Sequence, residues 1–240
     1  MAHIASQLSQ YDANHTHENA ISKLSFQSNQ ITHQGIAFLA KSLLHNRTIR
    51  SLNLSHNQIT NEGLYVLRDA LLTNRTITEL ILRNCRLSDQ AAIALAEYIA
   101  ESSAIEHLDL RENNIQISGI CGLAISMRTN KSLKKLDFDP MYSAGVANNT
   151  LDRTTQTGGL LSLTNLRRMT GNFGGLTSSG ITNNSNGITE HDAQELTEQK
   201  MKWMNDIQCI CERNLLLHEE EQRNHHQHHP LMDNNGKKID

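Results

Sequence analysis

The chain has 240 residues, of which 38% are hydrophobic and only 4% aromatic. This apolar content is low, so we expect part of the chain to lie outside any packed core. The net charge of −3 argues against nucleic-acid binding, because proteins that bind phosphates usually carry a basic surplus. No stretch approaches the roughly 18 apolar residues of a membrane span, and the N-terminus lacks the pattern of a secretory signal. We therefore expect an intracellular protein, cytoplasmic or nuclear or both, that does not contact membranes.

Residues 1–20 are mostly polar, with a weak apolar pattern at Ile4, Leu8 and Tyr11. The residues after them are repetitive, and a repeat array must cover the apolar face of its first unit. We therefore expect residues 1–20 to form an N-terminal cap or to be the remnant of a further repeat.

From residue 21 onward the sequence repeats itself every 28 residues. Each copy follows the pattern apolar-x-x-apolar-x-apolar-x-x-Asn-x-apolar. The four copies start at Ile21, Ile49, Ile77 and Ile105. A fifth start at Leu133 keeps the register and stops at Pro140. Such self-similarity is the signature of a solenoid, so we expect residues 21–142 to form one repeat domain.

The first half of each copy alternates like a β-strand. In Leu52-x-Leu54 every second side chain can point into a core. An asparagine then stands where the chain turns, and its amide can satisfy backbone groups that the turn exposes. Stacked copies of this residue would form a turn ladder, with a cysteine in the third copy: Asn29, Asn57, Cys85 and Asn113. We expect the Cys85 thiol to be buried and unreactive.

The second half of each copy has the i, i+3, i+4, i+7 apolar spacing of a helix. Hydroxyl side chains occupy the expected N-cap positions, at Thr32, Thr60 and Ser88. A strand and a helix per copy predict an α/β solenoid, a right-handed horseshoe arc of four 28-residue repeats plus a terminal strand. The parallel sheet would line its concave side and the helices its convex side. The pattern resembles the ribonuclease-inhibitor class of leucine-rich repeats, which implies a binding module.

The composition changes after the repeats. Residues 143–188 are rich in Gly, Ser, Thr and Asn, which cannot offset their own ordering entropy, so we expect a disordered low-complexity insertion. Order should return at 189–222, where Trp203, Ile207 and Ile210 lie along one row of an amphipathic helix. We expect this helix to cover the last repeat; partner binding through its apolar row is the alternative.

The tail, residues 223–240, carries a histidine cluster at His225, His226, His228 and His229. Clustered imidazoles can bind metal ions, but a closed site needs fixed geometry and supporting hydrogen bonds. A flexible polar tail supplies neither. We therefore predict a disordered His-rich tail and no metal site.

The sequence contains no motif for catalysis. It has no phosphate-binding loop, zinc-protease motif or serine-hydrolase elbow, and no nucleophile with a base and an orienting group. We therefore expect a non-enzymatic protein with no cofactor and no small-molecule substrate.

The strand residues between the leucines should point out of the concave face. In the last three strands they carry both charge signs and one apolar side chain. These candidate contact residues are Glu79, Ile81, Arg83, His107, Asp109, Arg111, Lys135, Asp137 and Asp139. Concave repeat surfaces commonly bind proteins, and mixed charge around arginines favours a specific protein partner. A polar strand face with no partner is the alternative.

Two stretches resemble one particular family. Residues 108–116 and 130–137 are similar to the last repeats of the protein phosphatase 1 regulatory subunit 37 family. Residues 207–217, with Cys211, Arg213 and Asn214, are similar to the helix that follows those repeats. The resemblance implies a regulator that binds the catalytic subunit of protein phosphatase 1, a Ser/Thr phosphatase, and inhibits it.

The resemblance also implies a docking motif, basic–Val–x–Phe, upstream of the repeats, and this sequence lacks it. The nearest strings, at residues 23–26 and 135–138, have leucine in place of valine. Both place leucine and phenylalanine on core-facing positions, so we assign them to packing. Either the chain is an N-terminally truncated form, or its phosphatase contact is lost or built differently.

Two other functions remain open. Some proteins with 28-residue repeats stimulate a small GTPase of the Ran type through the solenoid rim, although those usually carry more repeats and an acidic tail. A scaffold for another protein partner is the third alternative.

Overall fold

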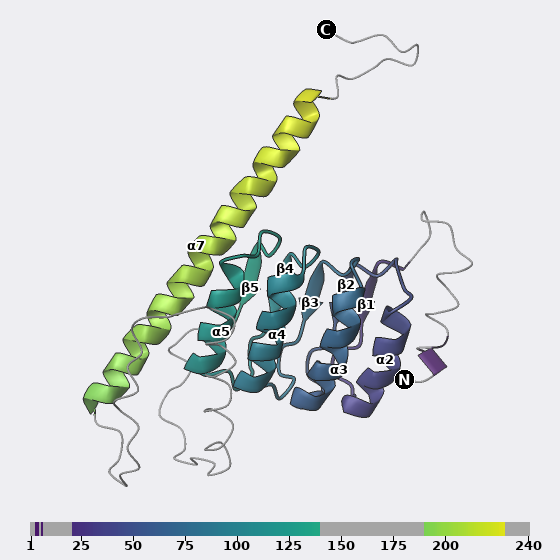
Figure 1. Cartoon of the computed structure of the whole chain (residues 1–240). Helices are drawn as coiled ribbons and strands as arrows, with labels where there is room; N and C mark the ends of the chain where they lie inside the picture. The colour runs from purple at the N-terminus through teal and green to yellow at the C-terminus, as the bar shows by residue number, and fades with distance from the viewer. Residues whose placement is uncertain (1–2, 5, 7–20, 140–189, 229–240) are drawn as a thin grey trace.

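The computed structural model describes residues 3, 4, 6, 21–139 and 190–228 (Figure 1). The five strands are β1 (Lys23–Ser25), β2 (Ser51–Asn53), β3 (Glu79–Ile81), β4 (His107–Asp109) and β5 (Lys135–Asp137). The helices are α2 (His33–Leu43), α3 (Thr60–Thr73), α4 (Asp89–Glu101), α5 (Ile117–Met127) and α7 (Glu190–His228). Most of the expected cap at 1–20, the expected insertion at 143–188 and the end of the tail from residue 229 lie outside the described residues.

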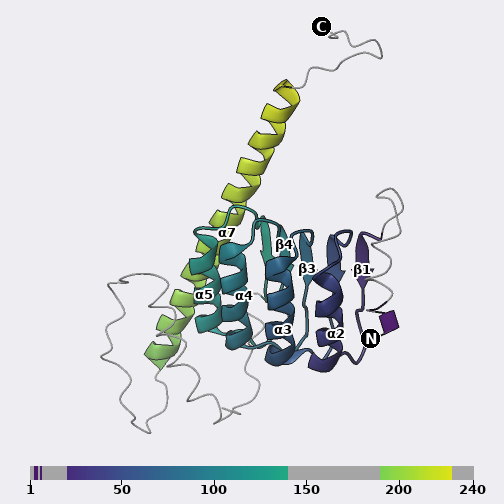
Figure 2. The ribbon, with the colours of Figure 1, turned by 45° about the vertical axis from the view of Figure 1, so that its right-hand side comes forward.

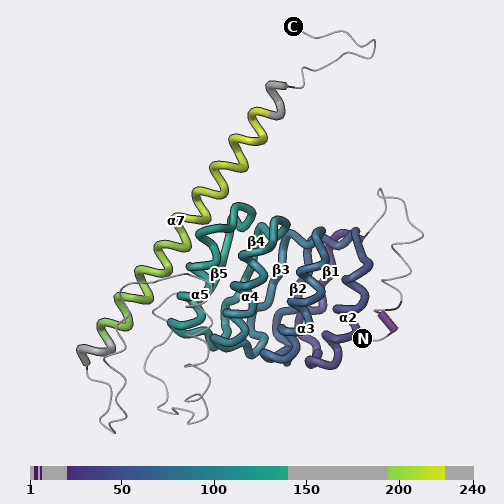
Figure 3. Tube along the Cα trace, in the orientation of Figure 1, coloured from purple at the N-terminus to yellow at the C-terminus, as the bar shows by residue number. Residues whose placement is uncertain are grey.

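The strands form one parallel sheet in the order β1-β2-β3-β4-β5. Its register follows the sequence period, because Leu24 pairs with Leu52, and Leu52 in turn pairs with Leu80. Helices α2 to α5 stand side by side along one face of this sheet (Figures 1 and 2). The tube in Figure 3 shows each repeat as one turn of a coil. The predicted α/β leucine-rich-repeat solenoid is confirmed.

The core lies between the sheet and the helices. Strand leucines such as Leu52 and Leu80 are fully buried, as are helix residues such as Leu39 and Leu67. Burying a side chain of this size stabilises the fold by about 1.5–3 kcal/mol. Since each repeat packs on its neighbours, α2 on α3 and α4 on α5, the core is continuous along the arc.

Two of the three predicted N-cap residues occupy the N-cap position of their helix. Thr32 and Ser88 precede α2 and α4 with extended backbones, although neither hydroxyl caps its helix. Thr60 is instead the first residue of α3, with a φ of 61°, and Ile59 precedes it in a helical conformation. The prediction for Thr60 was therefore wrong.

The ladder residue of the next repeat explains this exception. The amide oxygen of Asn57 accepts the Ile31 N–H at 3.0 Å, and that of Asn113 accepts the Leu87 N–H at 3.1 Å. Ile59 occupies the same repeat position, but the ladder residue beside it is Cys85, which has no amide oxygen to offer. The chain turns differently there, and Thr60 donates its N–H to the Cys85 carbonyl at 3.1 Å.

Helix α7 is the longest element, and it continues to His228 rather than ending near residue 222. It packs against α5 and β5. Its C-terminal half projects away from the arc (Figures 1 and 3). Despite its length, α7 is too polar to cross a bilayer, and no other helix in the described ranges could span one either.

Candidate functional site

The concave-face residues singled out in the sequence lie on three neighbouring strands. Glu79, His107 and Lys135 are register partners across β3, β4 and β5. Ile81, Asp109 and Asp137 form the next row. Arg83, Arg111 and Asp139 follow the strand ends at the same 28-residue spacing. We call these nine residues the concave rows.

His107 stands between two carboxylates. Its Nδ1 lies 3.1 Å from Glu79 Oε1, and its Nε2 lies 2.9 Å from Asp137 Oδ2. Because carboxylates only accept hydrogen bonds, both contacts need a proton on each ring nitrogen. The chain of contacts extends at both ends, where the Ser51 hydroxyl donates to Glu79 at 2.5 Å and Lys135 Nζ lies 2.9 Å from Asp137. Polar side chains from β2 to β5 are thus linked across the face.

These contacts keep the two carboxylates ionised. The hydrogen bond from Ser51 is the main cause that lowers the pKa of Glu79, with His107 adding to it. Partial burial would raise the pKa of Asp137, but hydrogen bonds from Lys135 and His107 outweigh it and lower the pKa. The face therefore presents fixed negative groups at neutral pH, each already paired within the sheet.

Asp109 is not available to a partner, although the sequence placed it on the exposed face. Only 3% of the residue is exposed. Its carboxylate accepts hydrogen bonds from the Arg111 backbone N–H at 3.0 Å, from Nε at 2.9 Å and from Nη2 at 2.5 Å. Burial would raise the pKa of Asp109, but the Arg111 donors outweigh it and lower the pKa. Asp109 holds the Arg111 guanidinium in place rather than meeting a partner itself.

Arg83 and Ile81 are neighbouring concave residues with partly exposed side chains. The Arg83 guanidinium forms an ion pair with Glu112 at the rim, and both side chains are about two-fifths exposed. Its Nε is buried without a hydrogen-bond partner, as is the hydroxyl of Ser55 one strand away. Ile81 is a half-buried apolar side chain among these polar groups.

The predicted turn ladder is present and is structural. Asn57 Nδ2 donates to Phe26 O at 2.9 Å in the preceding repeat and to Leu54 O at 2.8 Å in its own. Asn113 repeats these contacts, whereas Asn29, at the open end, bonds only within its own repeat. Cys85 fills its rung by donating from Sγ to Leu54 O at 3.3 Å. Burial raises the pKa of the Cys85 thiol to about 12, so the predicted inertness has a physical basis.

A second ladder, which sequence analysis missed, runs along the other edge of the solenoid. Its rungs lie between each helix and the next strand: Asn46, Asn74, Ser102 and Asn130. Asn74 Nδ2 donates to Leu43 O at 2.8 Å and Asn46 O at 3.0 Å, while its Oδ1 accepts two backbone N–H groups that follow it. The same 28-residue spacing in the sequence would have revealed this ladder.

Helix α7 adds a further rung to the second ladder. Asn214 is fully buried, and its Nδ2 donates to Asn130 O at 3.2 Å and Leu133 O at 2.9 Å. Arg213 also donates to Asn130 O, at 2.8 Å. Cys211 packs against the core beside these contacts, and burial raises the pKa of its thiol to about 11. The helix thus covers the end of the last repeat, and three residues that carried the family resemblance make these capping contacts.

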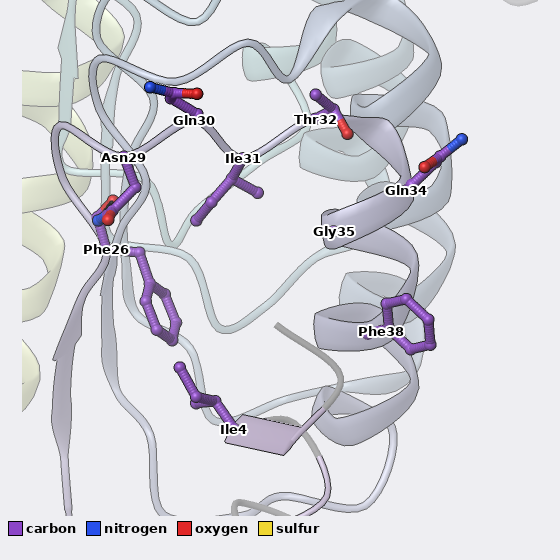
Figure 4. Close-up of a pocket in the computed structure, with 9 residues that line it drawn as sticks. All are labelled: Ile4, Phe26, Asn29, Gln30, Ile31, Thr32, Gln34, Gly35 and Phe38. Carbon is purple, nitrogen blue, oxygen red and sulfur yellow. Dashed lines mark hydrogen bonds between the residues drawn. The ribbon is translucent and has the colours of Figure 1, made fainter.

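The opposite end of the solenoid is open within the described residues. A hollow of about 460 Å³ lies there, lined by residues that include Phe26, Ile31 and Phe38. Figure 4 shows Ile4 beside Phe26, with Phe38 on the helix that forms the other wall. Ile21 is 40% exposed, whereas its repeat equivalent Ile49 is fully buried. The lining of the hollow mixes these apolar side chains with polar ones, namely Asn29, Gln30, Thr32 and Gln34.

Comparisons with known proteins agree with this fold. A leucine-rich-repeat family model matches residues 45–67 and 73–96. A solved structure of leiomodin-1 Actin-Binding Site 2 is 14% identical, with a TM-score of 0.50, over 68% of this chain and 84% of that chain. The tropomodulin C-terminal domain of Caenorhabditis elegans is 12% identical, with a TM-score of 0.48, over 69% of this chain and 95% of that chain. No curated protein matches the sequence. The matches support the leucine-rich-repeat fold described above.

Proposed function

We propose that this chain binds a protein partner through the concave rows and regulates that partner without catalysis. The observation that carries the proposal is the apolar side chain of Ile81 beside the reachable guanidinium of Arg83, on a face where the other charges are held in place by neighbours. Arginine beside a half-buried apolar residue is a common anchor in protein interfaces. The fixed charges around Ile81 and Arg83 disfavour partners whose own charges do not complement them.

The first partner that we propose is a catalytic subunit of protein phosphatase 1, which the chain would inhibit. Support comes from the resemblance of residues 108–116, 130–137 and 207–217 to a phosphatase regulatory family. The strings at 23–26 and 135–138 do not serve as docking motifs, because Leu24, Phe26, Leu136 and Phe138 pack against the core. The phosphatase contact would therefore be made by the concave rows.

Actin is a second candidate partner, because the solved leiomodin-1 structure with the same fold is described as an actin-binding site. A Ran-type GTPase and an unrelated scaffold partner remain the alternatives.

A binding assay with matched variants tests the proposal. The full chain is immobilised and offered purified phosphatase 1 catalytic subunit, actin and a Ran-type GTPase, followed by a cell lysate read by mass spectrometry. We expect the double variant Ile81→Glu/Arg83→Glu to weaken binding of the captured partner about tenfold or more, because such anchors contribute roughly 1.4 kcal/mol each to the binding free energy. Capture of the phosphatase with loss of its activity supports the first partner, and capture of actin supports the second.

The variants are chosen to spare the fold. Arg83 forms an ion pair only with Glu112 at the exposed rim. Reversing the charge at position 111 would instead leave the buried Asp109 carboxylate unpaired and destabilise the solenoid itself. Arg75→Glu is the matched control, because this exposed arginine lies outside the concave rows, at the edge where the second ladder runs. If Arg75→Glu weakens capture as much as the double variant, or if the double variant binds like the wild type, the concave rows are not the contact.

A further inference from the structure

A groove lies between the edge strand β5 and helix α7. Its volume is about 460 Å³, similar to that of the hollow at the other end of the arc. Leu136 of β5 and Phe138, which follows the strand, line one wall. Met201, Met204 and Leu215 of α7 line the other. Methionine side chains adapt to irregular partner surfaces, so such a wall suits protein binding.

Capping of the solenoid accounts for only part of the apolar surface of α7. Trp203, Ile207 and Ile210 form one row, and they pack against the core at the last repeat. Met204, Ile207 and Cys211 both line the groove and pack against the core, whereas Met201 and Leu215 at its two ends stay 42% and 44% exposed. Leu216, at 62%, extends this apolar surface where α7 leaves the arc. Exposed large side chains gathered in this way mark an interaction site.

The groove is lined by charges of both signs, with Lys134, Lys135 and Asp137 on the β5 side and Glu212 on α7. Glu212 lines the groove, and its partner is the neutral amide of Gln208, at 3.2 Å. Glu219, Glu220 and Glu221 follow one to two turns further along α7. Within the described part of α7, none of these four carboxylates forms an ion pair. The basic residues at the groove are already engaged, Lys134 with Glu106 and Lys135 with Asp137.

This charge pattern disfavours a second copy of the chain as the occupant. Two α7 helices packed in parallel would bring residues 219–221 of one copy against the same acidic residues of the other. An antiparallel pair centred on Leu216 would bring them against residues 211–213, where Arg213 is already bound to Asn130 O and Asn214. The facing carboxylates of two copies would repel each other, whereas the basic side chains of a partner would be attracted to them.

We propose that the groove between β5 and α7 binds a basic amphipathic helix of a protein partner. Met201 and Leu215 are 14 residues apart on α7, or about 21 Å at the rise of an α-helix. A helix of about four turns would lie along this length, with apolar side chains at i, i+3 or i+4 and i+7 in the groove. Its lysines or arginines would face Glu212 and Glu219, which are seven residues, or about two turns, apart on the groove side of α7. The groove shares Lys135 and Asp137 with the concave rows, but its apolar walls lie outside them.

Fluorescence anisotropy with designed peptides tests the proposal on the full chain. The probe is a labelled helical peptide with leucines on one face and lysines on the other, and its matched control carries glutamates for the lysines. We expect the lysine peptide to bind at least about tenfold more tightly, with affinity falling as salt rises. Leu215→Asp should weaken its binding about tenfold, and Glu212→Gln with Glu219→Gln should weaken it severalfold and flatten the salt dependence.

Val66→Asp is the matched control, since Val66 is a similarly exposed apolar residue (39%) on α3. It should bind the lysine peptide like the wild type, as should Arg83→Glu, which separates this site from the concave rows. Equal binding of the two peptides, or equal loss in Val66→Asp and Leu215→Asp, would overturn the proposal. So would a dimer in sedimentation that Leu215→Asp dissociates. An affinity that rises when a Gly-Ser linker replaces residues 143–188 would assign the groove to the chain's own segment instead.

Discussion

At the scale of single residues, the Asp109–Arg111 pair shows how the concave face combines recognition with stability. Its carboxylate is buried and accepts hydrogen bonds from three Arg111 donors, while the Arg111 side chain remains partly exposed. A buried carboxylate is tolerated only when it is fully paired. Arg111 therefore stabilises the fold by pairing with Asp109, whether or not it also contacts a partner.

The pair predicts an acid-dependent loss of stability. The folded-state pKa of Asp109 is lowered, so its contribution is present above its unfolded pKa of about 3.9 and is lost as pH falls through the folded value. We expect Asp109→Asn to lower the free energy of unfolding by about 1–3 kcal/mol at pH 7, and the deficit to shrink below about pH 4. Urea unfolding at pH 7, 5 and 3 measures this difference.

Asp69→Asn serves as the control, because Asp69 forms an exposed ion pair with Arg68, which contributes little. This variant should differ from the wild type by less than about 0.5 kcal/mol at each pH. An Asp109→Asn deficit of the same size at pH 3 and pH 7 would show that shape, not charge, causes the loss.

At the scale of elements, the second asparagine ladder couples neighbouring repeats. Asn74 follows α3, donates to two carbonyls near the end of α2, and accepts N–H groups just before β3. One side chain thus fixes the loop between a helix and the next strand, and fastens it to the repeat before. Ser102 holds the same place after α4 but only accepts, from Ala104 and Ile105.

The difference between Asn74 and Ser102 predicts that two substitutions of Asn74 will destabilise the fold to different extents. We expect Asn74→Ala to lower the free energy of unfolding by about 3 kcal/mol, because it leaves buried backbone donors and acceptors without partners. Asn74→Ser, which copies the natural residue at position 102, should lose less because its hydroxyl still accepts an N–H. Thermal and urea unfolding compare the two variants. A serine variant as unstable as the alanine variant would mean that the donated bonds carry the effect.

The elements also show what the sequence could predict. The 28-residue period predicted the strand register from Leu24 to Leu136, because identical repeats can stack in only one way. It did not predict the start of α3, because one missing amide oxygen at Cys85 changes the turn in the repeat before it. Nor did it predict the burial of Asp109, which depends on how Arg111 folds back onto it rather than on the alternation of the strand.

At the scale of the whole molecule, the solenoid is a row of units in which each contacts only its neighbours, so its ends decide its stability. Helix α7 closes one end with side chains far away in sequence, and no repeat pattern indicates which of them will do so. Buried Ile207 and Asn214 contact the last repeat, and Arg128 lies 5.6 Å from the Trp203 ring centre. Asn214 takes the place on Asn130 O that the asparagine of a further repeat would occupy.

The contact between Asn214 and Asn130 O predicts that removing it destabilises the solenoid first at its C-terminal end, next to α7. Asn214→Ala would leave the carbonyls of Asn130 and Leu133 buried without this donor, and we expect a cost of about 2 kcal/mol. Hydrogen exchange read by mass spectrometry should show faster exchange in α5 and β5, with little change in α2 and α3, because coupling passes only between neighbours. Asn205→Ala, an exposed position on the same helix, should leave the pattern unchanged. Equal acceleration along the whole arc would show that the repeats unfold as one unit and that α7 stabilises all of them at once.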